Sequence, residues 1–322
     1  MSSEGRWKDA ENLQVRLIEL DKRVTDEGQY AVRFASYLAS TYRNQGRWKE
    51  AEELEAQVVE TRTNVLGVEH LDTLTSIANL ASIYWNQGRW KEAEELEVQV
   101  VETRTKVLGV EHPGTLFSMA NLASTYWKQG RWKEAEELQL QVVETRKRVI
   151  GIEHPGTLTS IANLASIYRN QGRWKETEKL EVEVTETSKR VLGVEHPGTL
   201  TIVTNLASTY WTQGRWKEAE ELQLQVMETK KRVLGVEHPS TLASIANLAL
   251  TYSSQGRCKE AEELEIQVIE INKKIIGIEH PDTLTSIANL ASIYWNQGRW
   301  KEAEELLVFS LLKLYTPAQV DM

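Results

Sequence analysis

The chain has 322 residues, with 38 Lys plus Arg against 47 Asp plus Glu and a net charge of −9. This balance excludes the broad positive field that nucleic-acid backbones and anionic membranes require. Cys258 is the single cysteine, and the longest apolar run, Leu306 to Leu312, is far shorter than the ~20 residues of a membrane helix. We therefore expect a protein of a reducing, cytoplasmic compartment that binds neither nucleic acid nor a membrane.

One unit repeats along the chain with a period of 42 residues. All six histidines stand in Glu-His dipeptides at this spacing, as His70, His112, His154, His196, His238 and His280. A Gly-Arg-Trp-Lys phrase, in which Cys258 once replaces Trp, recurs from Gly5 to Gly298. Such a period is typical of a stacked repeat array, in which each unit buries its apolar face against its neighbours. Because the histidines are dispersed along the array, we expect them to begin helices and not to bind a metal.

The first half of each unit predicts an amphipathic helix, here named helix A. In the second unit it covers residues 73–87, where Ile77, Leu80, Ala81 and Tyr84 fall at i, i+3, i+4 and i+7. The following Gly88 suits the left-handed conformation in which helices commonly end.

The second half predicts a helix B, over residues 89–108 in the same unit. Its acidic residues come early and its basic residues late, as the helix dipole favours. We expect the tryptophans that begin the B helices to belong to the core: Trp7, Trp48, Trp90, Trp132, Trp174, Trp216 and Trp300. Cys258 in their place predicts a void, costing ~3–5 kcal/mol, and a locally soft sixth unit.

These elements predict an all-α solenoid of antiparallel helix pairs. The expected organisation is an N-terminal half-repeat over residues 1–28, seven pairs over 29–314 and a tail over 315–322. The stretch from Leu306 to Leu312 is apolar where other copies are charged. We expect it to fold back over the last pair; the alternative is a homodimer formed through Leu306 to Leu314.

The repeat resembles a known family. Asn-Leu-Ala-x-x-Tyr-x-x-Gln-Gly-Arg-Trp-x-Glu-Ala-Glu, from Asn79 to Glu94, resembles a tetratricopeptide repeat. The 42-residue period with Val-Leu-Gly-x-Glu-His-Pro, as from Val191 to Pro197, is similar to the kinesin light chain subtype. The nearly identical, Trp-rich copies also resemble the repeat arrays of fungal NOD-like receptors. The resemblance implies a right-handed superhelix whose A helices line a concave, protein-binding groove.

Helix A carries an uncharged stripe opposite its core face. Helix B of the second unit has nine charged residues, whereas helix A has none. The centre of the stripe is always asparagine: Asn79, Asn121, Asn163, Asn205, Asn247 and Asn289. A side-chain amide offers a donor and an acceptor that match a peptide group, and the resemblance implies that these asparagines hold the main chain of an extended peptide. The alternative is that each binds a neighbouring helix.

A more variable row lies one residue along from this stripe. Its members are Arg43, Trp85, Trp127, Arg169, Trp211, Ser253 and Trp295. Because Trp and Arg are enriched at binding hot spots, we expect this row, with Lys128 beside it, to set ligand specificity. The alternative is that each Trp packs on the next A helix.

The sequence contains no phosphate loop, nucleophile elbow or acid–base pair, so we predict no enzyme activity, no metal site and no cofactor. The leading interpretation is a non-enzymatic module that binds an extended peptide or protein segment, not strongly acidic, in the A-helix groove. One alternative is the ligand-sensing region of a fungal NOD-like receptor, which controls oligomerisation of an attached nucleotide-binding domain. Another is a purely structural scaffold.

Overall fold

The computed structural model describes residues 29–315. The predicted half-repeat over residues 1–28 and the tail from residue 316 onward lie outside the described residues. Within the described range the chain forms helices and no strand. The helices are α2 (Gln29–Asn44), α3 (Trp48–Leu66), α4 (Leu71–Asn86), α5 (Trp90–Leu108), α6 (Pro113–Lys128), α7 (Trp132–Ile150), α8 (Pro155–Asn170), α9 (Trp174–Val191), α10 (Pro197–Thr212), α11 (Trp216–Leu234), α12 (Pro239–Ser254), α13 (Cys258–Ile275), α14 (Pro281–Asn296) and α15 (Trp300–Tyr315).

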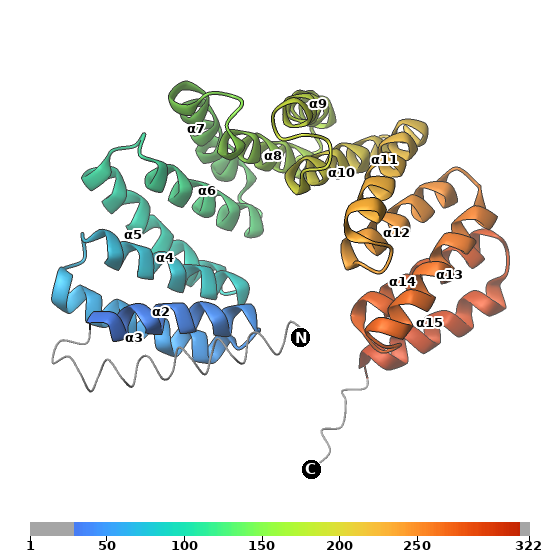
Figure 1. The fold of residues 1–322 in the computed structure, drawn as a ribbon, viewed down its shortest axis with the longest axis horizontal. Helices are drawn as coiled ribbons and strands as arrows, with labels where there is room; N and C mark the ends of the chain where they lie inside the picture. The colour runs from blue at the N-terminus through green and yellow to red at the C-terminus, as the bar shows by residue number, and fades with distance from the viewer. Residues whose placement is uncertain (1–28, 316–322) are drawn as a thin grey trace, which may run out of the picture. The chain divides into compact units, whose positions relative to one another are not determined.

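The even-numbered helices are the predicted A helices and the odd-numbered ones the B helices. The chain divides into two compact units, residues 1–171 and residues 172–322. In the first, α2 to α8 pack in sequence order, each helix against the next; in the second, α9 to α15 do the same (Figure 1). The predicted all-α array of helix pairs is confirmed.

Each histidine begins an A helix. His112 has an extended backbone, and its Nδ1 accepts a hydrogen bond from the Gly114 backbone N–H at 3.0 Å. The same bond forms at all six histidines. Each imidazole therefore accepts a hydrogen bond from one of the backbone N–H groups that the start of a helix leaves without a partner. At the other end of α4, Gly88 has a φ of 77°, which its missing Cβ permits. The predicted helix-entry role of the histidines is confirmed.

The core lies between neighbouring helices and combines small with branched residues. Ala81 of α4 and Ala93 of α5 are fully buried, which lets the two helices approach closely. Leu74 and Val100 fill the space beside them with 0% and 1% of their surface exposed. The predicted apolar stripe of helix A is therefore the buried one.

Four of the tryptophans that begin B helices are not core residues, so the prediction was wrong for them; Trp48 and Trp174 are half-buried, and Trp7 lies outside the described residues. Trp90, Trp132 and Trp216 expose 37%, 42% and 40% of their surface, and Trp300 exposes 64%. The first residue of a helix lies at the edge of a pair, so Trp90 borders a surface depression that the next loop, around Gln129 and Arg131, also lines. No described unit follows Trp300, which is the most exposed of the four.

The same geometry removes the expected defect at Cys258. This residue is half-buried at the edge of its pair, where none of the equivalent tryptophans in the described residues is buried. Replacing a Trp there opens no buried void, so the predicted softness of the sixth unit loses its physical basis.

The expected fold-back of the apolar stretch is also absent from the described residues. Helix α15 continues unbroken to Tyr315. Leu311 and Leu312 expose 51% and 61% of their surface. The stretch extends a regular B helix, because no residue before Pro317 interrupts helical hydrogen bonding.

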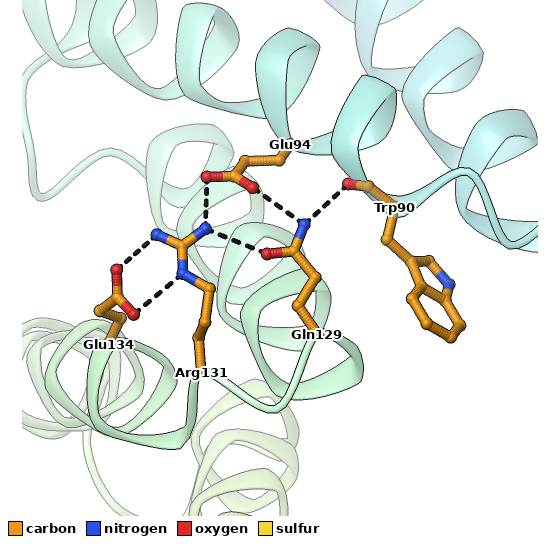
Figure 2. A network of polar contacts seen from close by, with 5 residues as sticks. All are labelled: Trp90, Glu94, Gln129, Arg131 and Glu134. Carbon is orange, nitrogen blue, oxygen red and sulfur yellow. Dashed lines mark hydrogen bonds and ion pairs between the residues drawn. The ribbon is translucent and has the colours of Figure 1, made fainter.

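Successive pairs are joined by a polar network around the Gln-Gly-Arg loop, which we name the clamp (Figure 2). Gln129 Nε2 donates to the Trp90 carbonyl oxygen at 3.1 Å and to Glu94 Oε2 at 2.8 Å. Arg131 Nη1 donates to the other oxygen, Glu94 Oε1, at 2.6 Å and to Gln129 Oε1 at 3.0 Å. Arg131 Nε also reaches Glu134 Oε2 at 2.9 Å in its own helix. One carboxylate of a B helix thus holds two side chains of the next loop.

The clamp recurs along the chain. Equivalent bonds join Gln87 and Arg89 to Glu52, Gln213 and Arg215 to Glu178, Gln255 and Arg257 to Glu220, and Gln297 and Arg299 to Glu262. Partial burial would raise the pKa of Glu220, but the hydrogen bonds from Arg257 and Gln255 outweigh it and hold this pKa below its ordinary value. Glu220 is therefore charged in the folded protein.

Replacing Glu94 by Ala should test the clamp. The change removes the acceptor for two hydrogen bonds between successive pairs, so we expect the free energy of unfolding to fall by about 1–2 kcal/mol. Urea unfolding followed by circular dichroism measures this. Glu95→Ala, one residue along and exposed, is the matched control, and equal effects of the two substitutions would contradict the assignment.

Candidate functional site

Each asparagine of the row lies above a buried polar residue of the preceding B helix. We name these B-helix residues the floor residues: Glu55, Glu97, Gln139, Glu181, Gln223 and Glu265. All six are buried, with 0–8% of their surface exposed. Sequence reasoning missed them, although Glu97 lies four residues after Ala93 and three before Val100, on the buried face of its helix.

At the first junction the asparagine takes part in stacking. Asn79 Nδ2 lies 3.3 Å from Glu55 Oε1 and 3.5 Å from Ser36 Oγ, and donates toward both. Ser36 Oγ in turn donates to Glu55 at 3.1 Å. Burial raises the pKa of Glu55, and the bonds from Asn79 and Ser36 oppose that rise. Three successive helices, α2, α3 and α4, meet at this carboxyl.

Two other floor carboxyls are less well compensated. Burial raises the pKa of Glu97 to about 7, and the nearby Thr125 hydroxyl lowers it only in part. Burial likewise raises the pKa of Glu265 to about 7, against a smaller opposing effect of Asn289. Both side chains therefore change charge near neutral pH.

Two cavities open over the glutamine floor residues. The first, of about 270 Å³, is lined by Trp85, Trp127, Lys128, Gln139 and Asn163 among others. The second, of about 190 Å³, is lined by Thr204, Ser208, Trp211, Gln223, Asn247, Leu250 and Thr251. The two are equivalent positions in the repeat, two periods or 84 residues apart. The structure thus brings members of the asparagine row and of the Trp/Arg row together in the same cavities.

The Trp/Arg row forms a seam between neighbouring A helices. Arg43 Nη1 donates to Ser82 Oγ of the next A helix at 3.2 Å, and Trp211 Nε1 donates to Ser254 Oγ at 3.1 Å. Arg169 is half-buried and donates to Ser166 Oγ within its own helix, whereas Trp295 is 60% exposed. Most of this row is therefore engaged with its neighbours.

Lys128 extends the seam. Its ammonium group lies 5.3 Å and 4.9 Å from the ring centres of Trp85 and Trp127, within the range of a cation–π interaction. It places one positive charge beside the first cavity. Its counterpart 84 residues later is Thr212, and no charged residue lines the second cavity.

Residues 29–315 contain no cluster of three or more His, Cys, Asp or Glu side chains placed to hold a metal ion. Over the same residues, no helix combines the length and apolar character needed to span a bilayer.

Comparison with known proteins agrees with this architecture. Tetratricopeptide repeat models match residues 30–106, 77–148, 115–185, 157–232 and 199–274, and a further one matches residues 283–308. The chain belongs to the tetratricopeptide repeat family. The predicted fold class, an all-α solenoid of these repeats, is confirmed. No protein with a curated description matches the chain.

Several solved structures are similar to this tetratricopeptide array. A Podosopora anserina protein, described as a kinesin light chain with nearly identical TPR-like repeats, is 38% identical over 63% of this chain and 95% of its own, with a TM-score of 0.58. The Pyrococcus horikoshii signal-transduction ATPase with a tetratricopeptide repeat sensor is 17% identical over 93% of this chain and 43% of its own, with a TM-score of 0.67. Aspartyl phosphate phosphatase F from Bacillus subtilis is 9% identical over 94% and 77%, with a TM-score of 0.69. The last two likenesses concern the fold alone.

The raised pKa of Glu97 predicts a pH-dependent stability. The folded state holds this proton more tightly than the unfolded chain, so the free energy of unfolding falls as pH rises from about 4.5 to about 7. Glu97→Gln places at this position the residue that other copies carry at 139 and 223. We expect the variant to be more stable than the native chain at pH 8, by on the order of 1–3 kcal/mol, and about equally stable at pH 4.5.

The measurement is urea unfolding at a series of pH values. Glu95→Gln, an exposed site on the same helix, is the control and should leave the pH dependence of the native chain in place. Parallel curves for native chain and Glu97→Gln would mean that Glu97 does not titrate in this range.

Proposed function

We propose that the protein is a non-enzymatic interaction module that binds an extended peptide or protein segment along the surface of its A helices. The observation that carries this proposal is the recurring cavity between successive A helices, in which an asparagine amide and a tryptophan ring lie together. Family membership agrees, because the fold presents its helix pairs as a continuous surface. The 38% match to a protein described as a kinesin light chain supports that subtype.

The surroundings of the cavities suggest the kind of ligand. The A helices contribute few charges here, with Arg43, Lys128 and Arg169 as the basic points. A strongly acidic or basic segment would find little electrostatic complement on this surface. The proposed ligand is therefore a segment of low net charge. The proposed location is a reducing, cytoplasmic compartment, in which a single cysteine remains a free thiol.

A triple substitution of Asn121, Asn163 and Asn205 by Ala tests the proposal. Peptides selected on the native chain from a displayed random library serve as ligands. We expect the variant to lose most of its affinity for them, since every amide of this set that faces the ligand supplies one or two hydrogen bonds. Far-ultraviolet circular dichroism controls for folding, and unchanged affinity in a folded variant would refute binding along the A helices.

A second candidate is the ligand-sensing region of a larger receptor. The fold similarity to an ATPase that carries a tetratricopeptide repeat sensor favours this possibility, although this chain covers only 43% of that protein. In such a receptor the same surface would bind the ligand and control an attached nucleotide-binding domain. A coding sequence for such a domain joined to this chain would support this candidate, and a messenger that encodes the repeats alone would exclude it.

The exposed face of α15 supports self-association as a further property. Leu307, Val308, Leu311 and Leu312 expose 39–61% of their surface on one helix, and an isologous dimer would cover the same face on both copies. We expect light scattering to report a mass that rises with concentration from 36.8 kDa toward twice that value. Leu311→Glu with Leu312→Glu should keep the mass at the monomer value, and a native chain that stays monomeric throughout would refute this dimer.

A further inference from the structure

The exposure of each asparagine follows the chemistry of the floor residue beneath it. Asn163 and Asn247, whose floor residues are Gln139 and Gln223, are exposed. The four asparagines above a glutamate are half-buried: Asn79, Asn121, Asn205 and Asn289. The row is uniform in sequence but divides into two structural classes.

At Glu55 and Gln139 the contacts differ because one side chain ends in a carboxyl and the other in a carboxamide. A buried carboxylate needs donors, and Asn79 turns toward Glu55 to supply one. A glutamine carries its own donor, and Gln139 Nε2 uses it at 2.9 Å on the backbone oxygen of Ser160 in the next A helix. Gln139 thus joins the two helices without Asn163, whose amide remains at the surface.

The two exposed asparagines lie at the two cavities. Each cavity therefore presents a pair of carboxamides, Gln139 with Asn163 and Gln223 with Asn247, beside the ring of Trp127 or Trp211. Gln223 is 8% exposed, and its Oε1 is buried without a hydrogen-bond donor. An unsatisfied acceptor of this kind costs free energy until a donor reaches it.

We propose that these two cavities are the specificity sites of the array, and that each binds an uncharged carboxamide side chain, Asn or Gln, of an extended peptide. The four half-buried asparagines line neither cavity, and Asn79 instead joins successive helices through Glu55. This inference rests on the proposed peptide-binding function and restricts it to two of the six asparagines.

The chemistry of the cavities selects this ligand class. Apolar walls, such as Ile167 in the first cavity and Leu250 in the second, suit the methylene groups of a Gln or Asn side chain. The carboxamide pair offers both donors and acceptors, which another carboxamide matches in either direction. A charged side chain would lose its hydration in the second cavity without gaining a counter-charge, because no charged residue lines it.

The experiment uses the full chain and labelled hexapeptide pools with capped ends, in which one central residue is fixed as Gln, Glu, Lys or Leu. Fluorescence anisotropy measures the affinity of each pool. We expect the Gln pool to bind at least about fivefold more tightly than the others, as one or two added hydrogen bonds would give. Asn163→Ala with Asn247→Ala should remove this preference, whereas Asn79→Ala with Asn289→Ala should keep it and lower the melting temperature.

A substitution of the floor residues provides a second, independent test. Gln139→Glu with Gln223→Glu gives both cavities the floor that Glu55 provides elsewhere, so the asparagines should turn inward and the Gln preference should disappear. Far-ultraviolet circular dichroism confirms folding of every variant. Pools that bind without preferring Gln, or equal losses in both asparagine pairs, would overturn this inference and leave peptide binding standing. If no pool binds the native chain, the proposed function itself fails.

Discussion

The array depends on the clamp, because it is a directional contact that recurs between one helix pair and the next. The apolar contacts between pairs consist of alanines and branched side chains, which favour close packing but tolerate sliding. Glu94 offers its two oxygens to two different side chains of the following loop, Gln129 and Arg131, at 2.8 and 2.6 Å. Gln129 additionally binds the backbone of Trp90, which ties the loop to the start of a helix. Because hydrogen bonds are directional, this set favours one relative position of the two pairs.

The clamp also explains why the B helices are so highly charged. Their early glutamates could all have been solvated side chains on an outer face. Glu94 and Glu220 instead belong to the junctions, since each binds the loop of the following unit. The arginine of that loop also lies over a tyrosine of its own unit, with Arg131 4.1 Å from the ring centre of Tyr126. One short loop thus provides both the ion pair with the preceding B helix and the cation–π contact within its own unit.

The sequence predicts the fold well, because its signals are local and repeated. The spacing of apolar residues predicts the helices. The start of helix α6 is predictable too, because the hydrogen bond from the Gly114 backbone N–H to His112 lies within three consecutive residues. The features that the sequence does not predict depend on contacts between residues far apart in the chain. Periodicity places Trp90 on the same side of its helix as Ala93, but the end of a helix pair leaves the first turn without a covering element. The clamp is not predictable from local sequence for the same reason, since Gln129 and Glu94 are 35 residues apart and belong to different copies of the repeat.

The candidate site was predictable as a surface and not as a set of individual positions. Six identical asparagines gave no reason to separate Asn163 from Asn79. The difference lies in a second helix, where the terminal group of residue 139 is an amide and that of residue 55 a carboxyl. The carboxyl of Glu55 accepts hydrogen bonds from Ser36 and Asn79, whereas the amide of Gln139 joins the helices with its own hydrogen bond. A repeat protein with nearly identical copies can therefore make a few of them different by changing one buried residue beneath the site.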